Sequence, residues 1–254
     1  MDEPSTRPAW YAVAGSRRGG RTGRVGPSGA AGDWVTVLHL PYTAWHLGYV
    51  LVGAGLAAHL SVERLVATLV AFLLAVGVAA HALDELHGRP LGTRIPAGAL
   101  TAVAVASLGG AVALGVVGIA RVGAALVAFM AVGAVLVLAY NLELAGGRLH
   151  NDSTFALAWG SFPVLTAYYA QTGTLSAAAV LAAAYAYGLS RAQRHLSSEA
   201  RQVRRRVATI DGRKTYTDGT TEPITRETIL GPIERALVAL SWSTCAIGIA
   251  LVVR

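Results

Sequence analysis

The fold is decided by residues 97–120, which read AGALTAVAVASLGGAVALGVVGIA. This stretch carries no charged side chain, and it is longer than the roughly 20 residues that an α-helix needs to cross the hydrocarbon core of a bilayer. It is also rich in Ala, Gly and Val, and small residues let helices approach one another closely in lipid. The stretch therefore predicts a membrane-spanning helix.

Six further apolar stretches of similar length lie along the chain. The composition agrees with them, because 54% of the residues are hydrophobic, the mean hydropathy is +0.51 and only 14% are charged. Soluble domains are nearer a quarter charged, so a soluble globular enzyme is disfavoured. The sequence predicts an all-α, polytopic membrane helical bundle of about seven transmembrane helices, at residues 36–60, 64–83, 97–120, 122–140, 153–171, 174–190 and 234–253.

Two polar segments accompany the predicted spans. Residues 1–33 are rich in Gly, Pro, Ser and Arg without apolar periodicity, which predicts a disordered tail and no secretory signal. Residues 191–233 begin with a basic helical run, and their turn signals Asp211-Gly212 and Asp218-Gly219 indicate a small hairpin. We therefore expect one helical membrane domain, residues 34–254, that contains this polar segment.

The Lys and Arg residues are distributed unevenly between the two ends of the predicted helices. If the amino terminus is cytoplasmic, 18 of the 21 lie on that side: five in the tail, two in the loop after the second span, one after the fourth and ten between residues 191 and 235. The positive-inside rule then predicts a cytoplasmic amino terminus and a carboxyl terminus on the opposite side. The net charge of +7 suits anionic lipid or a phosphate-bearing ligand, and the apolar spans argue against nucleic acid.

The most unusual polar stretch closes the second span and begins at His81. If that helix continues to residue 85, then His81, Asp84 and Glu85 share one face by their i, i+3 and i+4 spacing. Carboxylates at the end of a membrane helix can hold Mg²⁺ through oxygen ligation, so these three residues are candidate metal ligands. A solvated helix end with local salt bridges is the alternative. We favour a functional role for Asp84 and Glu85, because ionisable groups at the edge of a span are costly, whereas the two interpretations are equally good for His81 and His87.

Basic side chains near this stretch are suited to bind a phosphate. Arg89 and Arg94 follow in the same loop, beside His87, and guanidinium groups bind phosphate through paired hydrogen bonds. Two more polar clusters follow the fourth and sixth spans. In the later cluster Arg191 and Arg194 share a helical face. This face could bind a phosphate, but it could equally well anchor the helix to lipid headgroups. The clusters comprise Asn141, Glu143, Arg148, His150, Asn151 and Asp152, and then Arg191, Gln193, Arg194, His195, Glu199 and Arg201.

Other polar residues lie inside the predicted spans. His46, in the first span, is expected to be a hydrogen-bonded interior residue. Four tyrosines in the fifth and sixth spans could line a cavity or anchor the helices at the membrane interface; these are Tyr168, Tyr169, Tyr185 and Tyr187. Pro163 is expected to kink the fifth span.

Three passages together resemble the UbiA superfamily of intramembrane prenyltransferases. Residues 84–100 read DELHGRPLGTRIPAGAL and resemble the Asp-rich motif of the family and the helix start that follows it. Residues 140–151 resemble the tyrosine and basic loop after the fourth helix. Residues 158–167, AWGSFPVLTA, and the later Gln171-Thr-Gly173 resemble the fifth helix. The passages occur in the family's order and cover about residues 34–200.

The resemblance implies a UbiA-like bundle that moves an isoprenyl group from a polyprenyl diphosphate to a lipophilic acceptor, assisted by Mg²⁺ at the cytoplasmic face. By position, Asp84 would be the metal carboxylate, with Glu85 and His81 beside it, and Arg148 would match the basic residue that contacts the diphosphate. No catalytic residue is assigned. The candidate diphosphate ligands are His87, Arg89, Arg94, Arg148, Arg191 and Arg194.

The chain also departs from the family pattern. A second Asp-rich motif should follow the sixth span, but residues 191–199 read RAQRHLSSE and are basic. Whether the protein is an enzyme therefore stays open, and the alternative is a non-catalytic UbiA-fold protein that binds an isoprenoid or phosphorylated lipid. A metal-dependent membrane oxidase is less favoured, because the seven histidines form no His-x-x-x-His box. A retinal protein is discarded, because residues 234–254 contain no Lys for a Schiff base.

Overall fold

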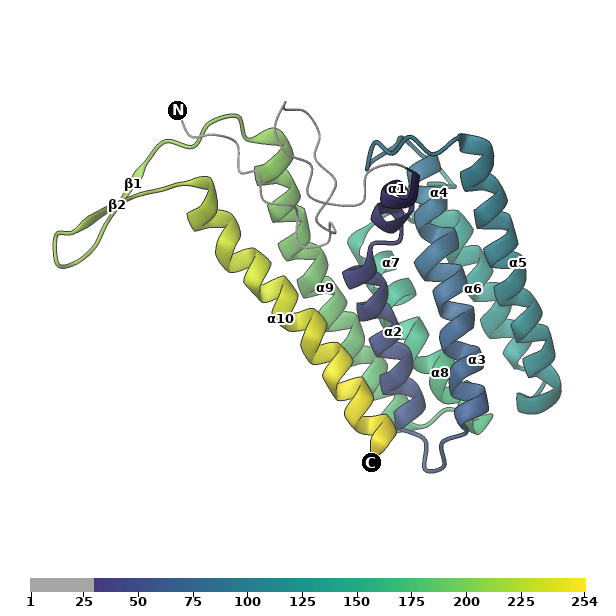
Figure 1. Ribbon diagram of the computed structural model, residues 1–254. Helices are drawn as coiled ribbons and strands as arrows, with labels where there is room; N and C mark the ends of the chain where they lie inside the picture. The colour runs from purple at the N-terminus through teal and green to yellow at the C-terminus, as the bar shows by residue number, and fades with distance from the viewer. Residues whose placement is uncertain (1–29) are drawn as a thin grey trace.

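The computed structural model describes residues 30–254, which are mostly helical (Figure 1). Two of the helices contain π-helical segments, η1 and η2, without a break in the helix. When each unbroken run is counted once, the described residues form eight helices. They are α1 (Ala30–Val37), α2 (Leu40–Gly55), α3–η1–α4 (Val62–Phe72, Leu73–Ala80 and His81–Leu86), α5 (Ala97–Val122), α6 (Leu126–Asn141), α7–η2–α8 (Asp152–Ala156, Leu157–Ser161 and Phe162–Thr172), α9 (Ala177–Arg206) and α10 (Arg226–Val253).

Three of these helices are long and apolar enough to cross a membrane: Val62–Leu86, α5 and α10. Helix α6 is apolar as well, but it is shorter. These helices support the predicted membrane location. Three helices that meet these criteria of length and composition are fewer than the seven predicted. Helix α2, for example, has only 16 residues, and α9 changes from apolar to basic after residue 190.

From α2 to α10, successive helices run in opposite directions (Figure 1). The loops 87–96, 142–151 and 207–225 therefore meet at one end of the bundle, which we call the polar end. The loops 56–61, 123–125 and 173–176 lie at the other end. The predicted tail falls outside the described residues except for residues 30–33, which begin α1.

A small antiparallel hairpin connects α9 to α10, within the polar segment predicted at residues 191–233. Strand β1 (Arg213–Thr215) pairs with β2 (Thr221–Pro223), and all six strand residues are exposed. Asp218 shapes the turn, because its Oδ1 accepts hydrogen bonds from the backbone N–H and the hydroxyl of Thr220 at 2.9 and 2.7 Å. These bonds lower the pKa of the Asp218 carboxyl. The hairpin projects away from the helices (Figure 1).

Helix α2 lies at the centre of the bundle, against α8 and α10. Glycines allow these close approaches: a Cβ on Gly53 would lie only 2.2 Å from the carbonyl oxygen of Val164. Around this crossing the core is apolar and includes Val50, Ala54 and Trp159. Small residues at helix crossings are the pattern expected for packing in lipid, where close van der Waals contact holds helices together.

The two π-helical segments lie next to histidine side chains. His46 Nδ1 donates to the carbonyl of Trp159 in η2 at 2.9 Å, and His81 Nδ1 donates to the carbonyl of Gly77 in η1 at 3.0 Å. Pro163 lies two residues after the end of η2 and has no N–H to donate to Trp159, four residues earlier. The helix thus has a π segment just before Pro163, and His46 is the hydrogen-bonded interior residue that the sequence predicts. Such segments often mark functional sites.

Candidate functional site

The polar end gathers polar side chains, most of them titratable, from stretches that are far apart in the sequence. We call these residues the polar cluster: His39, Tyr42 and His46 on α2 and its start, His81 and Asp84 on α4, Tyr140 on α6, His150, Asp152, and Gln193 and Arg194 on α9. The carboxylate of Asp84 interacts electrostatically with His81, His150 and Arg194, and also with the neighbouring carboxylate of Glu85. Parts of all three predicted clusters thus meet at one place.

Ring contacts and hydrogen bonds hold the polar cluster together. The imidazole of His39 stacks on that of His81 with ring centroids 5.0 Å apart, and Tyr140 stacks on His150 at 4.4 Å. The amide of Gln193 donates to the hydroxyl of Tyr42. These contacts join α2 to α4 and to α9, and α6 to the loop before α7, so the cluster's geometry depends on how these segments pack.

Arg194 is the cation at the centre of this arrangement. Its Nε donates to Asp152 Oδ1 at 2.9 Å, and its guanidinium carbon lies 5.1 Å from the centre of the Phe155 ring. Only 18% of the side chain is exposed. A guanidinium group shielded from water in this way, with further N–H donors, suits the binding of a phosphate or carboxylate.

Three imidazoles in the polar cluster share the same tautomer. The Nδ1 atoms of His46, His81 and His150 lie 2.9, 3.0 and 3.1 Å from backbone carbonyl oxygens. A carbonyl oxygen only accepts, so each Nδ1 carries the proton. In its neutral form each of these imidazoles therefore has its lone pair on Nε2 and can accept a proton or hydrogen bond there.

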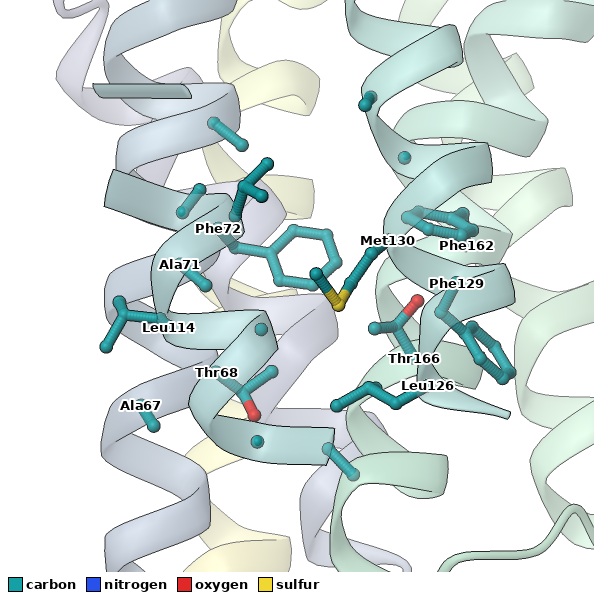
Figure 2. A pocket seen from close by; sticks show the side chains of 18 of the residues that line it. Ala67, Thr68, Ala71, Phe72, Leu114, Leu126, Phe129, Met130, Phe162 and Thr166 are labelled. Carbon is teal, nitrogen blue, oxygen red and sulfur yellow. The ribbon is translucent and has the colours of Figure 1, made fainter. Parts of the chain in front are cut away.

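An apolar cavity of 460 Å³ lies between α3, α5, α6 and the η2–α8 helix (Figure 2). Trp159 is one of the lining residues, and its ring is 5.9 Å from that of Tyr140 and 6.4 Å from that of His46. No residue of the polar cluster itself lines the cavity. The charged residues of its lining, Glu63, Arg64 and Arg121, lie at the opposite end of the bundle. None of the four tyrosines proposed to line a cavity, Tyr168, Tyr169, Tyr185 and Tyr187, lines this one.

Glu85 does not join the polar cluster. Its side chain is fully buried, and its carboxylate accepts hydrogen bonds from the backbone N–H of Leu91 at 3.0 Å and from the N–H and hydroxyl of Thr93 at 2.9 and 2.8 Å. The carboxylate thus anchors the following loop to α4. Of the three predicted metal ligands, His81 and Asp84 belong to the polar cluster, whereas the Glu85 carboxylate lies near Asp84 but is bound by the following loop.

This arrangement limits how Mg²⁺ could be held. Among residues 30–254, no group of three or more His, Cys, Asp or Glu side chains is arranged to bind a metal ion. Glu85 is engaged by its loop and Asp152 by Arg194, which leaves Asp84 as a carboxylate within the cluster. Mg²⁺ is commonly held by one or two carboxylates together with substrate phosphates. Asp84 therefore fits an ion that arrives with a diphosphate better than a resident one.

No known protein family, curated protein or solved structure matches this chain. The resemblance to the UbiA superfamily therefore stays a prediction, which rests on the three passages quoted above.

Most of the predicted diphosphate ligands lie at the polar end but outside the polar cluster. Arg89 turns back into its own loop, where its Nη1 donates to the carbonyl of Ile95 at 2.6 Å. His87 is exposed, with its Nε2 3.6 Å from Glu143. Arg94 is also exposed, so this loop contributes no side chain of the predicted diphosphate set to the cluster.

The remaining three predicted ligands differ in their positions. Arg194 belongs to the polar cluster. Arg191 lies beside the cluster, where its guanidinium donates to the hydroxyl of Ser153 at 2.9 Å, and Arg148 is exposed. His39 was missed by the sequence reasoning. A signal was present, because His39 lies two residues before Pro41, and proline favours the first turn of a helix. That position places His39 at the start of α2 and hence at the polar end.

Proposed function

We propose that the chain is a UbiA-like membrane prenyltransferase that binds an isoprenyl diphosphate at the polar cluster and passes the isoprenyl group to a lipophilic acceptor. The observation that carries the proposal is the electrostatic interaction of Asp84 with Arg194, 110 positions apart in the sequence, and with the imidazoles of His81 and His150, at one end of an apolar helical bundle. Ionisable groups placed at the end of membrane helices are usually functional.

The proposal includes the finer topology. All seven helices from α2 to α10 would cross the bilayer, with the polar end and the amino terminus on the cytoplasmic side and the carboxyl terminus opposite. The concentration of Lys and Arg in the segments at the polar end supports this direction. The diphosphate would then be bound from the cytoplasm while its chain stays in lipid.

The chemistry follows from the charges in the cluster. Arg194 stabilises the negative charge that develops on the diphosphate as the allylic C–O bond breaks. Bound Mg²⁺, held by Asp84 and the phosphates, would supply further positive charge. The acceptor then forms a bond to the freed carbon and loses a proton. A neutral imidazole with its lone pair on Nε2 is suited to accept that proton.

Replacing Arg194 with Ala should weaken the binding of geranylgeranyl diphosphate by at least about thirtyfold, because loss of a desolvated charged partner costs about 2 kcal/mol or more. Binding is measured on detergent-purified protein. Arg206→Ala is the matched control, since Arg206 is an exposed arginine in the last turn of the same helix. If both variants bind as the parent does, the polar cluster is not the diphosphate site.

Asp84→Asn should remove the dependence of that binding on Mg²⁺, because the amide has lost the charge that holds the cation. The titration is run with and without Mg²⁺ on the parent and the variant. Mg²⁺-dependent binding that survives in Asp84→Asn would contradict the role given to Asp84.

The second candidate is a non-catalytic protein that binds an isoprenoid or phosphorylated lipid. It is favoured by the engagement of Glu85 and Asp152, which leaves few carboxylates for a cation. Binding that ignores both Mg²⁺ and Asp84 but needs Arg194 would support it. Any prenylated product that depends on the protein, in a screen of lipophilic acceptors, would exclude it.

A further inference from the structure

We propose that the apolar cavity holds one acyl chain of a membrane phospholipid, and that Glu63 and Arg121 at one end of the cavity bind the ammonium and the phosphate of a phosphatidylethanolamine headgroup. No residue of the polar cluster lines this cavity. The inference therefore goes beyond the proposed function and does not depend on it.

The cavity is long and narrow. It follows α3 and η1 from Ser61 to Val76, and α5 from Leu108 to Val122, which at 1.5 Å per residue is a length of about 20 Å along the helices. A volume of 460 Å³ over that length gives a mean cross-section of about 23 Å². This is close to the cross-section of one extended hydrocarbon chain, whereas a fused ring system needs a wider chamber.

The lining of the cavity also suits a hydrocarbon chain. Away from its charged end, the polar side chains that line it within the described part of the protein are Thr68, Thr166 and Trp159. Thr68 donates to the carbonyl of Arg64 at 2.7 Å, and the hydroxyl of Thr166 is buried from solvent. In Figure 2 side chains of α3 and α5 face those of α6 and α8, with Met130 reaching between the two walls. Its flexible thioether can adapt to a mobile chain.

The charged end of the cavity, which we call the mouth, lies opposite the polar end of the bundle. Glu63 and Arg121 line it there, and their side chains are 73% and 61% exposed, so the mouth is accessible from outside the protein. In a bilayer crossed by α3–η1–α4 and α5, charged groups at these helix ends stand at the level of the lipid headgroups. A chain that enters the cavity from here leaves its headgroup beside Glu63 and Arg121.

These two side chains complement a headgroup that carries both charges. Arg121 Nη1 donates to Glu63 Oε1 at 2.9 Å. A carboxylate accepts several hydrogen bonds and a guanidinium has five donors, so both groups can bind further partners. A phosphate beside Arg121 and a primary ammonium beside Glu63 would form an array of four alternating charges. An anionic headgroup without an ammonium would instead be repelled by Glu63.

The test uses Trp159, a buried tryptophan that lines the cavity, as a reporter. Bromine atoms on an acyl chain quench tryptophan fluorescence at short range. A variant with Trp159 as its only tryptophan, the other four replaced by Phe, is placed in nanodiscs that contain phosphatidylethanolamine brominated near the ends of its acyl chains. Trp159 should be quenched strongly. The same signal should be obtained without those four changes, as the difference between the parent and Trp159→Phe.

Two further single-tryptophan proteins calibrate the signal. Trp45 is buried and does not line the cavity, so it should be quenched weakly, whereas the exposed Trp242 should be quenched by any brominated lipid. Ala71→Phe fills the chamber and should protect Trp159. Ala106→Phe is the matched control, because Ala106 is exposed on α5 outside the lining. Quenching of Trp159 no stronger than that of Trp45, or equal in both phenylalanine variants, would overturn the proposal.

The headgroup is tested with brominated phosphatidylethanolamine or brominated phosphatidylglycerol as a minor component of unbrominated phosphatidylcholine. Phosphatidylethanolamine should be about two- to fivefold more effective at quenching Trp159, which is the range for exposed charge contacts. Glu63→Gln should abolish this preference, and Asp211→Asn, at an exposed carboxylate of the polar end, should not. Equal quenching by the two lipids, or stronger quenching by phosphatidylglycerol, would overturn the assignment of the mouth.

An isoprenyl chain is the other possible occupant of the cavity. Added geranylgeranyl diphosphate should leave the quenching of Trp159 by brominated phosphatidylethanolamine unchanged. Relief of the quenching would show that the cavity takes the isoprenyl chain, and would overturn the proposal. Arg194→Ala should also leave the quenching unchanged, so that failure of the diphosphate site and failure of the phospholipid site are distinguishable.

Discussion

Replacing Gly53 with Ala is expected to destabilise the helical bundle by roughly 3 kcal/mol or more, the upper range for overpacking a tight contact. The added Cβ would lie 2.2 Å from the carbonyl oxygen of Val164 and 2.9 Å from its carbonyl carbon. Both are backbone atoms of α8, so no side chain can rotate away. Relief requires α2 and α8 to separate, which would also disturb the contact between α2 and α10.

The matched control for this prediction is Gly188→Ala, which should have the opposite sign. Gly188 lies within α9, and a Cβ there would meet no other atom within 4 Å. Alanine in place of glycine inside a helix stabilises by about 0.5–1 kcal/mol. The measurement is unfolding of the two detergent-purified variants by heat or SDS. A Gly53→Ala protein as stable as the parent would contradict the close crossing of α2 and α8.

Replacing Glu85 with Ala should also cost roughly 3 kcal/mol of stability, because three partly buried donors lose the fully buried carboxylate that accepts their hydrogen bonds. Two backbone N–H groups and the hydroxyl of Thr93 lose their partner, and the loop that follows α4 loses its anchor. Glu85→Gln should cost less, since the amide retains one acceptor oxygen. The loss is measured by unfolding the detergent-purified variants, as for Gly53.

Two comparisons test this assignment. Glu63→Ala removes an exposed ion pair with Arg121 and should change stability by no more than about 0.5 kcal/mol. In contrast, a Glu85→Ala protein that keeps its stability but loses Mg²⁺-dependent binding would restore Glu85 to the metal site predicted from the sequence. The two neighbouring carboxylates thus have separable roles: Glu85 supports the loop and Asp84 belongs to the polar cluster.

The apolar stretches predicted most helices, and the remaining differences arise from local signals at helix ends. The predicted span 174–190 continues as α9 to Arg206, because no glycine or proline interrupts the basic run. Helix α10 begins at Arg226, eight residues before the predicted start. Thr225 caps it, and Thr228 completes a capping box with Thr225. Hydropathy alone does not detect such a polar first turn.

The site was partly predictable for a topological reason. An alternating series of helices places every second loop at the same end, so the polar stretches near Asp84, His150 and Arg194 had to lie on one side. The orientation of the Glu85 side chain toward the following loop was not predictable, since it depends on how residues 91–93 fold back onto α4. The stacking of His39 on His81 likewise depends on the packing of α2 against the α3–η1–α4 helix.

Helix α9 is about 45 Å long at 1.5 Å per residue, which exceeds the roughly 30 Å of a hydrocarbon core. In the proposed topology its basic last turns, and the hairpin that follows them, would therefore stand in water. Residues 216–220 form the turn between the exposed strands β1 and β2, which is closed by a hydrogen bond from the backbone N–H of Tyr216 to the carbonyl of Thr220. Exposed loop tips tolerate insertions well. A folded domain inserted at Gly219 would give this 26.2 kDa protein an extramembrane mass by which single particles could be aligned, without touching the bundle.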